Sequence, residues 1–176
     1  ARNSHGFAAL RFALARMGAV LVPVNFMLKP DEAAYILRHA GAKLLAVDAG
    51  LAELGRAAAA LDTKVERLLA LPSEYGDEPA GASVSMGSNA ALSFASLAAG
   101  TRTFAEPELD SRDLAQIVYT SGTESLPKGA MLTHEAVIWQ YVSCIVDGDM
   151  KADDLMLHSL PLYHCAQLDV FLGPAV

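Results

Sequence analysis

Cysteine is scarce in this chain, and its two cysteines form no recognisable pattern. Cys144 and Cys165 make neither a Cys-x-x-Cys pair nor a spacing with histidine that is typical of zinc sites. The sequence therefore gives no sign of a disulfide framework or of a structural zinc site. We expect two buried thiols, and we expect the protein to lie in the cytoplasm, a reducing compartment.

Long apolar runs and excess positive charge are also missing. The longest candidate, Met17 to Leu28, is interrupted by Pro23 and Asn25 and falls short of the roughly 18 residues of a membrane span. The chain has 13 basic and 20 acidic residues, a formal net charge of -7. A nucleic-acid binder needs a clustered basic face. We therefore expect no transmembrane segment and no nucleic-acid partner, and local geometry must hold any anionic ligand.

The chain has ample material for a core and an alternating pattern of helices and strands. Of its 176 residues, 53% are hydrophobic, and the mean hydropathy is +0.30. These values suit one domain or part of a larger one. The patterns predict an α/β fold, a mainly parallel sheet with helices on both faces. Helices are predicted near 7–17, 30–40, 51–61, 90–99 and 134–146, and strands at 19–25, 42–48, 64–71, 114–119 and 155–161.

Signals at the ends of these elements support the assignment. Gly18 and Gly41 stand where helix C-caps belong, and Pro30 suits the first turn of a helix. Thr133 is a good N-cap for the helix that begins at His134. Residues 72–90 are rich in Pro, Ser, Gly, Asp and Glu and are predicted to form a surface loop.

The segment YTSGTESLPKGAMLTH, residues 119–134, has the composition of a phosphate cradle. After a predicted strand, it offers consecutive backbone N–H groups, several hydroxyls and a glycine, and such amides bind anions. Lys128 adds a point charge that suits phosphate. The segment does not match GxxxxGK[ST], because proline precedes the lysine and Gly129-Ala130 follows it. An ordinary turn between two strands, rich in Ser, Thr and Gly, remains the alternative.

The pattern YTSGTxxxPKGxMLTH resembles the phosphate-loop signature of the adenylate-forming superfamily, which includes acyl-CoA synthetases, luciferases and the adenylation domains of peptide synthetases. Residues 18–48 resemble the first helix-strand-helix-strand unit of acyl-CoA synthetases. LPLYH, 160–164, resembles a segment on their acyl-pocket side. The resemblance implies that residues 1–176 are a fragment of the N-terminal AMP-binding domain, with its phosphate loop at 119–129.

The same resemblance implies that other parts of the family's enzymes are absent. The adenine- and ribose-binding segments, the magnesium-binding glutamate and the C-terminal domain are not in this sequence, and Ala1 looks like an internal start. The fragment alone is therefore expected to be inactive. No catalytic residue and no metal ligand is assigned within it.

For the whole protein, the resemblance implies ATP-dependent activation of a carboxylic acid, most simply a fatty acid. The acid becomes an acyl-adenylate and then an acyl-CoA thioester. ATP, Mg²⁺ and coenzyme A are the implied cofactors and partners. The implied phosphate-binding residues are Thr120, Ser121, Gly122, Thr123, Lys128 and Gly129, and the residues on the acyl and coenzyme A side are Tyr163 and His164.

One departure from the signature and several alternatives stay open. Glu124-Ser125 stands where the family usually has Thr-Gly, and a carboxylate near triphosphate is repulsive unless a cation or a turn intervenes. Glu124 is either a tolerated, solvent-facing variant, or it lies near magnesium or impairs ATP binding. The alternatives for function are an amino-acid adenylation domain of a peptide synthetase, a catalytically silent homologue that acts as a binding module, and a simple anion-binding module.

Overall fold

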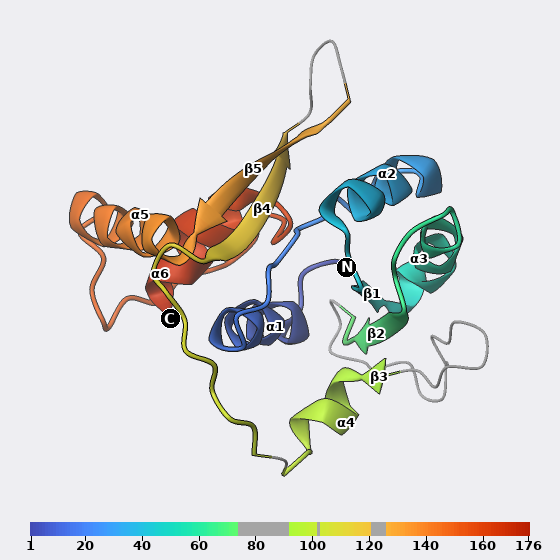
Figure 1. Cartoon of the computed structure of the whole chain (residues 1–176). Coiled ribbons are helices and arrows are strands. Elements are labelled where there is room, and N and C mark those ends of the chain that lie inside the picture. Colours follow the sequence, from blue (N-terminus) through green and yellow to red (C-terminus); the bar gives the residue numbers. More distant parts are fainter. Residues whose placement is uncertain (74–91, 102, 121–125) are drawn as a thin grey trace. The chain divides into compact units, whose positions relative to one another are not determined.

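The computed structural model describes residues 1–73, 92–101, 103–120 and 126–176, and it divides into two compact units (Figure 1). Unit 1 comprises residues 1–9 and 24–105, and unit 2 comprises residues 10–23 and 106–176. The helix α1 (His5–Arg16) contributes residues to both.

Unit 1 is built on a parallel sheet. Its strands are β1 (Leu44–Asp48), β2 (Arg67–Leu71) and β3 (Leu92–Ser93), in the order β1-β2-β3. All pairs are parallel, with Leu44 opposite Arg67 and Asp48 opposite Leu71. The helical elements are α2 (Pro30–Ala40), the 3₁₀ turn Ala49–Leu51, α3 (Ala52–Ala59) and α4 (Phe94–Ala98). The predicted α/β class with a parallel sheet is confirmed.

The ends of α2 follow from its sequence. Pro30 occupies the first turn, where a missing N–H costs nothing, and Glu32 Oε2 accepts a hydrogen bond from the Lys29 N–H at 2.7 Å. Gly41 closes the helix with φ 65°, a left-handed conformation that L side chains rarely adopt.

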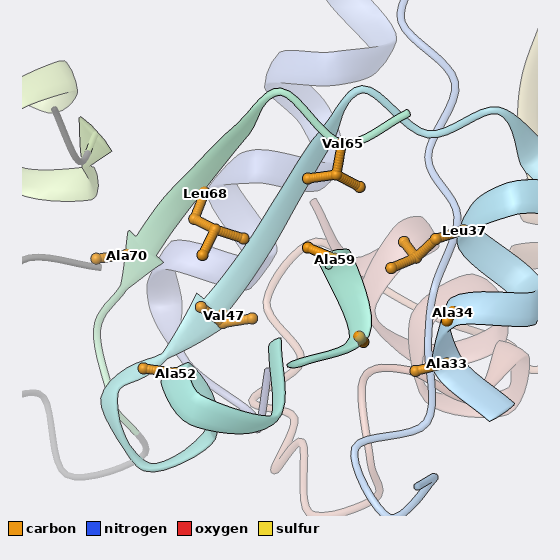
Figure 2. Packing of buried hydrophobic residues seen from close by; sticks show 10 residues of the cluster. Ala33, Ala34, Leu37, Val47, Ala52, Ala59, Val65, Leu68 and Ala70 are labelled. Carbon is orange, nitrogen blue, oxygen red and sulfur yellow. The ribbon is translucent and has the colours of Figure 1, made fainter. Parts of the chain in front are cut away.

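Small apolar side chains let these helices approach the sheet closely. Figure 2 shows Leu37 of α2 and Ala59 of α3 facing a cluster that includes Val47 of β1. A Cβ on Gly55 of α3 would lie only 2.8 Å from Cγ1 of Val47. The core of unit 1 is therefore tight and rich in alanine. Its buried members are Ala33, Ala34, Leu37, Val47, Ala52, Ala58, Ala59, Val65, Leu68 and Ala70.

Unit 2 contains an antiparallel hairpin and the C-terminal helices. Strands β4 (Leu114–Thr120) and β5 (Lys128–Thr133) pair antiparallel, and α5 (His134–Asp147) follows β5 directly. The π-helix η2 (Ala166–Leu172) runs into the short helix α6 (Gly173–Ala175). No helix in the described part of the chain is long and apolar enough to cross a membrane.

Two predicted strands are wrong. Of residues 19–25, only Leu21 pairs, in a single parallel bridge to Gln116, and Pro23 has no N–H with which to extend the ladder. Residues 155–161 form no strand, and the side chains of Leu155 and Leu157 are 101% and 90% exposed. An alternating pattern alone gives no strand without a neighbour to pair with.

The burial expected for the thiols is also wrong. Both cysteines are free, but Cys144 is half-buried and Cys165 is exposed. Most of the predicted surface loop at 72–90 lies outside the described residues.

Candidate functional site

The hairpin β4–β5 carries the two ends of the predicted phosphate loop. Thr120, the last residue of β4, lies opposite Lys128, the first residue of β5. The Thr120 Oγ1 is 3.5 Å from the Lys128 carbonyl oxygen, a long hydrogen bond. The loop residues between them, Ser121, Gly122, Thr123, Glu124 and Ser125, lie outside the described residues. The strands thus bring Thr120, Lys128 and Gly129 together, and their contact with phosphate stays a prediction.

Lys128 is an available cation. It is exposed, and its ammonium group makes no ion pair within the described ranges of the chain. Its predecessor, Pro127, fixes the backbone on entry to the strand. Because no carboxylate in the described residues competes for the Lys128 ammonium group, that group is available to an anionic ligand such as phosphate.

The packing of the neighbouring side chains in the hairpin leaves room only for glycine at position 129. It lies opposite Tyr119, and a Cβ at position 129 would stand 2.7 Å from Ile117 Cγ2 and 3.2 Å from Tyr119 Cζ. The two β4 side chains occupy the space that any side chain at 129 would need. Gly129 therefore has a packing role next to Lys128, whether or not it also contacts a ligand.

Tyr163 and His164 lie in the turn that leads into η2. His164 is exposed and Tyr163 is half-buried. The backbone N–H of Ala166 donates to Nδ1 of His164 at 3.2 Å. A neutral His164 that accepts at Nδ1 carries its proton on Nε2, so it presents a donor on its outer edge.

Gln167 fastens the LPLYH segment to η2. Its side chain is buried, at 2% exposure, and its Oε1 accepts the Leu160 N–H at 2.9 Å. Its Nε2 lies 2.7 Å from Nδ1 of His158. Residue 158 is thus held by hydrogen bonding in place of the strand pairing that the sequence suggested. One buried amide thereby fixes the path of the chain before Tyr163 and His164.

A buried polar cluster joins four elements of unit 2. Gln116 of β4 donates from Nε2 to Oδ2 of Asp169 in η2 at 2.9 Å. Arg11 of α1 donates from Nη2 to the Tyr141 hydroxyl of α5 at 3.1 Å, and the same nitrogen is 4.0 Å from Asp169 Oδ1. Sequence reasoning missed this cluster, because residues so far apart along the chain share no spacing that predicts contact.

Burial changes the ionisation of two members of this cluster. Loss of solvation raises the pKa of Asp169 above its ordinary value, while the bond from Gln116 and the charge of Arg11 act in the opposite direction. Loss of solvation also raises the pKa of Tyr141, and Arg11 opposes that shift. Tyr141 therefore stays neutral and can accept the hydrogen bond from the arginine.

The described residues contain no group of three or more His, Cys, Asp and Glu side chains that would hold a metal ion. The adjacent acids Asp153 and Asp154 lie in an exposed turn, in which Asp154 Oδ2 accepts the Lys151 N–H at 2.8 Å. This donor set does not fit a magnesium site.

Comparison with known proteins gives a family match over the full length. The sequence model of the family described as AMP-binding enzyme matches residues 1–176. A feruloyl-CoA synthase of Amycolatopsis sp is 30% identical over 178 residues, which cover 99% of this chain and 30% of that protein. The long-chain-fatty-acid–CoA ligase FadD13 of Mycobacterium tuberculosis is 32% identical over 178 residues, which cover 99% of this chain and 31% of that protein.

A solved structure gives the same result for the fold. ATP-bound MatB from Rhodopseudomonas palustris superposes with a TM-score of 0.75 and 28% identity, covering 98% of this chain and 31% of that one. The chain thus spans less than a third of the length of these relatives.

Proposed function

The chain belongs to the AMP-binding enzymes, and from that premise we propose that the whole protein is an acid–thiol ligase that activates a carboxylic acid with ATP and passes the acyl group to coenzyme A. One observation carries the proposal: an exposed Lys128 without an ion pair in the described residues stands beside Thr120 at the base of a loop with the phosphate-loop signature. The names of two relatives, a feruloyl-CoA synthase and a long-chain-fatty-acid–CoA ligase, support the reaction class.

The proposed reaction has two steps. A carboxylate oxygen attacks the α-phosphorus of ATP, the bond from that phosphorus to the bridging oxygen of the β-phosphate breaks, and pyrophosphate leaves. The thiol of coenzyme A then attacks the acyl carbon of the mixed anhydride. AMP departs with the oxygen that had joined it to the acyl group, and the thiol proton is lost to solvent. Because charge accumulates on phosphate oxygens in the first step, groups that stabilise it contribute most.

We assign the residues of this chain to the two sides of that reaction. Lys128 and the hydroxyl of Thr120 contact the β- and γ-phosphates, together with the loop residues Ser121, Gly122 and Thr123. Gly129 keeps Lys128 at the start of β5 by allowing Tyr119 to pack against it. Tyr163 and His164 lie on the acyl and coenzyme A side. Mg²⁺ would accompany ATP, and the resemblance puts its glutamate ligand outside residues 1–176.

The acid is proposed to be a fatty acid, with an aromatic acid such as ferulate as the second class to test. The relatives named above cover both classes. We also propose a cytoplasmic location, with both cysteines free as thiols in that compartment.

The proposal is tested by exchange of labelled pyrophosphate into ATP, using the full-length protein and a panel of acids. We expect exchange with fatty or aromatic acids, and an acyl-CoA product when coenzyme A is added. Exchange with amino acids alone would favour a peptide-synthetase adenylation domain. ATP binding without exchange for any acid would favour a silent homologue, and either result would overturn the proposal.

A further inference from the structure

Three polar side chains of unit 2 meet where little of their surface reaches solvent. Arg11, Gln116 and Asp169 are 3%, 0% and 6% exposed. Removing such groups from water is costly, and well-packed apolar side chains at the same places often stabilise a fold as well or better. Stability alone is therefore a weak reason for this cluster.

The cluster connects the two sides of the proposed site. Gln116 lies on β4, the strand that ends at Thr120 and leads into the phosphate loop, and Asp169 lies on η2, the helix that follows Tyr163 and His164. The bond from Gln116 Nε2 to Asp169 Oδ2, at 2.9 Å, is a direct buried link between those two elements.

Both ends of this link are firmly anchored. The backbone on either side of Gln116 is bonded to Leu21, whose N–H donates to Ala115 O at 3.0 Å and whose carbonyl accepts the Ile117 N–H at 2.9 Å. On the other side, the backbone N–H of Leu168 donates to the His164 carbonyl at 3.1 Å, a bond that does not depend on the side chain at 168. A displacement of Asp169 would therefore be passed on to His164 through the first turn of η2.

Arg11 extends the link to a further helix. Its guanidinium holds the Tyr141 hydroxyl at 3.1 Å and lies 4.0 Å from the free oxygen of Asp169. The ring of Tyr141 fills the space where a Cβ on Gly173 would be, so α5 and the start of α6, which directly follows η2, pack closely against each other. Gln116 and Arg11 thus constrain Asp169 from two directions.

We propose that Asp169 is a positioning residue: through Gln116 and Arg11 it fixes the acyl-side segment relative to the strand that carries the phosphate loop. The proposal rests on the proposed function, because it concerns how an acid and ATP are aligned. Adenylate formation needs the carboxylate oxygen close to, and in line with, the α-phosphorus. Small misplacements of two bound reactants cost rate, on the order of 10²-fold, more than they cost the binding of either reactant.

The kinetic test uses variants of the full-length enzyme. In Asp169→Leu and in the milder Gln116→Met, the rate of adenylate formation per titrated active site should fall by roughly 10²-fold. The KM for ATP and the KM for the acid should each change by less than about threefold, as expected when alignment and not binding is lost. Asp169→Asn keeps an oxygen that can accept from Gln116, so it should recover most of the rate.

Leu168→Ala is the matched control, because it loosens the same helix without touching the polar link. It should lower the thermal midpoint yet keep the wild-type rate per active site. A rate of adenylate formation within threefold of the wild type, in Asp169→Leu or in Gln116→Met, would overturn the proposal. An equal loss of rate in Leu168→Ala would also overturn it.

A second measurement needs no activity, and it separates this proposal from the proposed function. Amide hydrogen exchange should become at least about tenfold faster in residues 161–172 of Gln116→Met and in residues 114–120 of Asp169→Leu, relative to Leu168→Ala. The wild type could form no adenylate while each substitution still made exchange faster in the other element. The proposed function would then be wrong, but the link between β4 and η2 would be supported. Exchange that changed only in the mutated element would refute the link.

Discussion

Tyr119 and Gly129 lie opposite each other across the hairpin β4–β5, and the tyrosine ring occupies space beside Gly129 that a side chain would otherwise fill. Aromatic side chains often cover a glycine on a neighbouring strand in this way. The pair fixes the start of β5 and with it the backbone of Lys128. The hairpin geometry that the proposed phosphate site needs thus depends on a residue that contributes no functional group.

Gly129→Ala is expected to destabilise the domain by about 1–3 kcal/mol, because the added methyl group overpacks against Ile117 and Tyr119. Denaturant unfolding measures the loss. In an Ile117→Ala background, the closest contact is removed and the same substitution should cost less. If Gly129→Ala were neutral in the wild-type background, the tight packing seen here would be contradicted.

Thr133→Ala should weaken the start of α5. The Thr133 Oγ1 accepts the Ala136 N–H at 3.2 Å, so the substitution leaves one helix-end donor without its partner. The expected cost is about 0.5–2 kcal/mol in unfolding free energy. Thr133→Ser keeps the hydroxyl and serves as the control. Equal stability of the Ala and Ser variants would show that this cap contributes nothing.

Asp169→Asn should change how stability depends on pH. Because burial raises the pKa of Asp169 above the ordinary 3.8, the folded protein holds this proton more tightly than the unfolded chain. As the pH rises from the pKa of Asp169 in the unfolded chain to its pKa in the folded protein, the wild type therefore loses free energy of unfolding. Above that range the loss is constant. The asparagine variant has no such proton, so its stability relative to the wild type should increase across that range and then level off.

Denaturant unfolding of both proteins between pH 3 and 7 tests this sign. The groups that face Asp169 are Arg11, Tyr141 and the uncharged Gln116, and Tyr141 stays neutral over this range because burial raises its pKa from the ordinary 10.0. A relative stability of Asp169→Asn that falls with rising pH would show that the fold stabilises Asp169 as a carboxylate, and a flat one would show that the pKa of Asp169 is not shifted; either would contradict the prediction.

The local parts of this structure could be predicted from the sequence. Pro30, Gly41 and Thr133 act at the helix ends where their side chains and backbone freedom predict. The apolar runs at 42–48 and 64–71 contain the strands Leu44–Asp48 and Arg67–Leu71, because buried parallel strands need apolar side chains on both faces.

The parts that depend on distant partners could not be predicted. The run at 155–161 has the composition of a strand, but no described strand pairs with it. The π-helix η2 has no local signal, and its geometry accompanies the buried contacts of Gln167 and Asp169. For the candidate site, the phosphate-loop pattern predicts a role for Lys128 and its neighbours, but nothing in the sequence indicated that Asp169 would meet Gln116.

The central claim is that Lys128 binds the phosphates of ATP, and steady-state kinetics of Lys128→Ala in the full-length enzyme test it most directly. Loss of a charge-assisted contact of about 1.5–3 kcal/mol should reduce kcat/KM for ATP by roughly 10- to 150-fold. The KM for the acid should change little. The control Lys151→Ala, which removes another exposed lysine of unit 2, should leave kcat/KM for ATP and the KM for the acid unchanged. If Lys128→Ala left the dependence on ATP as it is in the wild type, the hairpin would carry an ordinary turn and the phosphate-site assignment would be wrong.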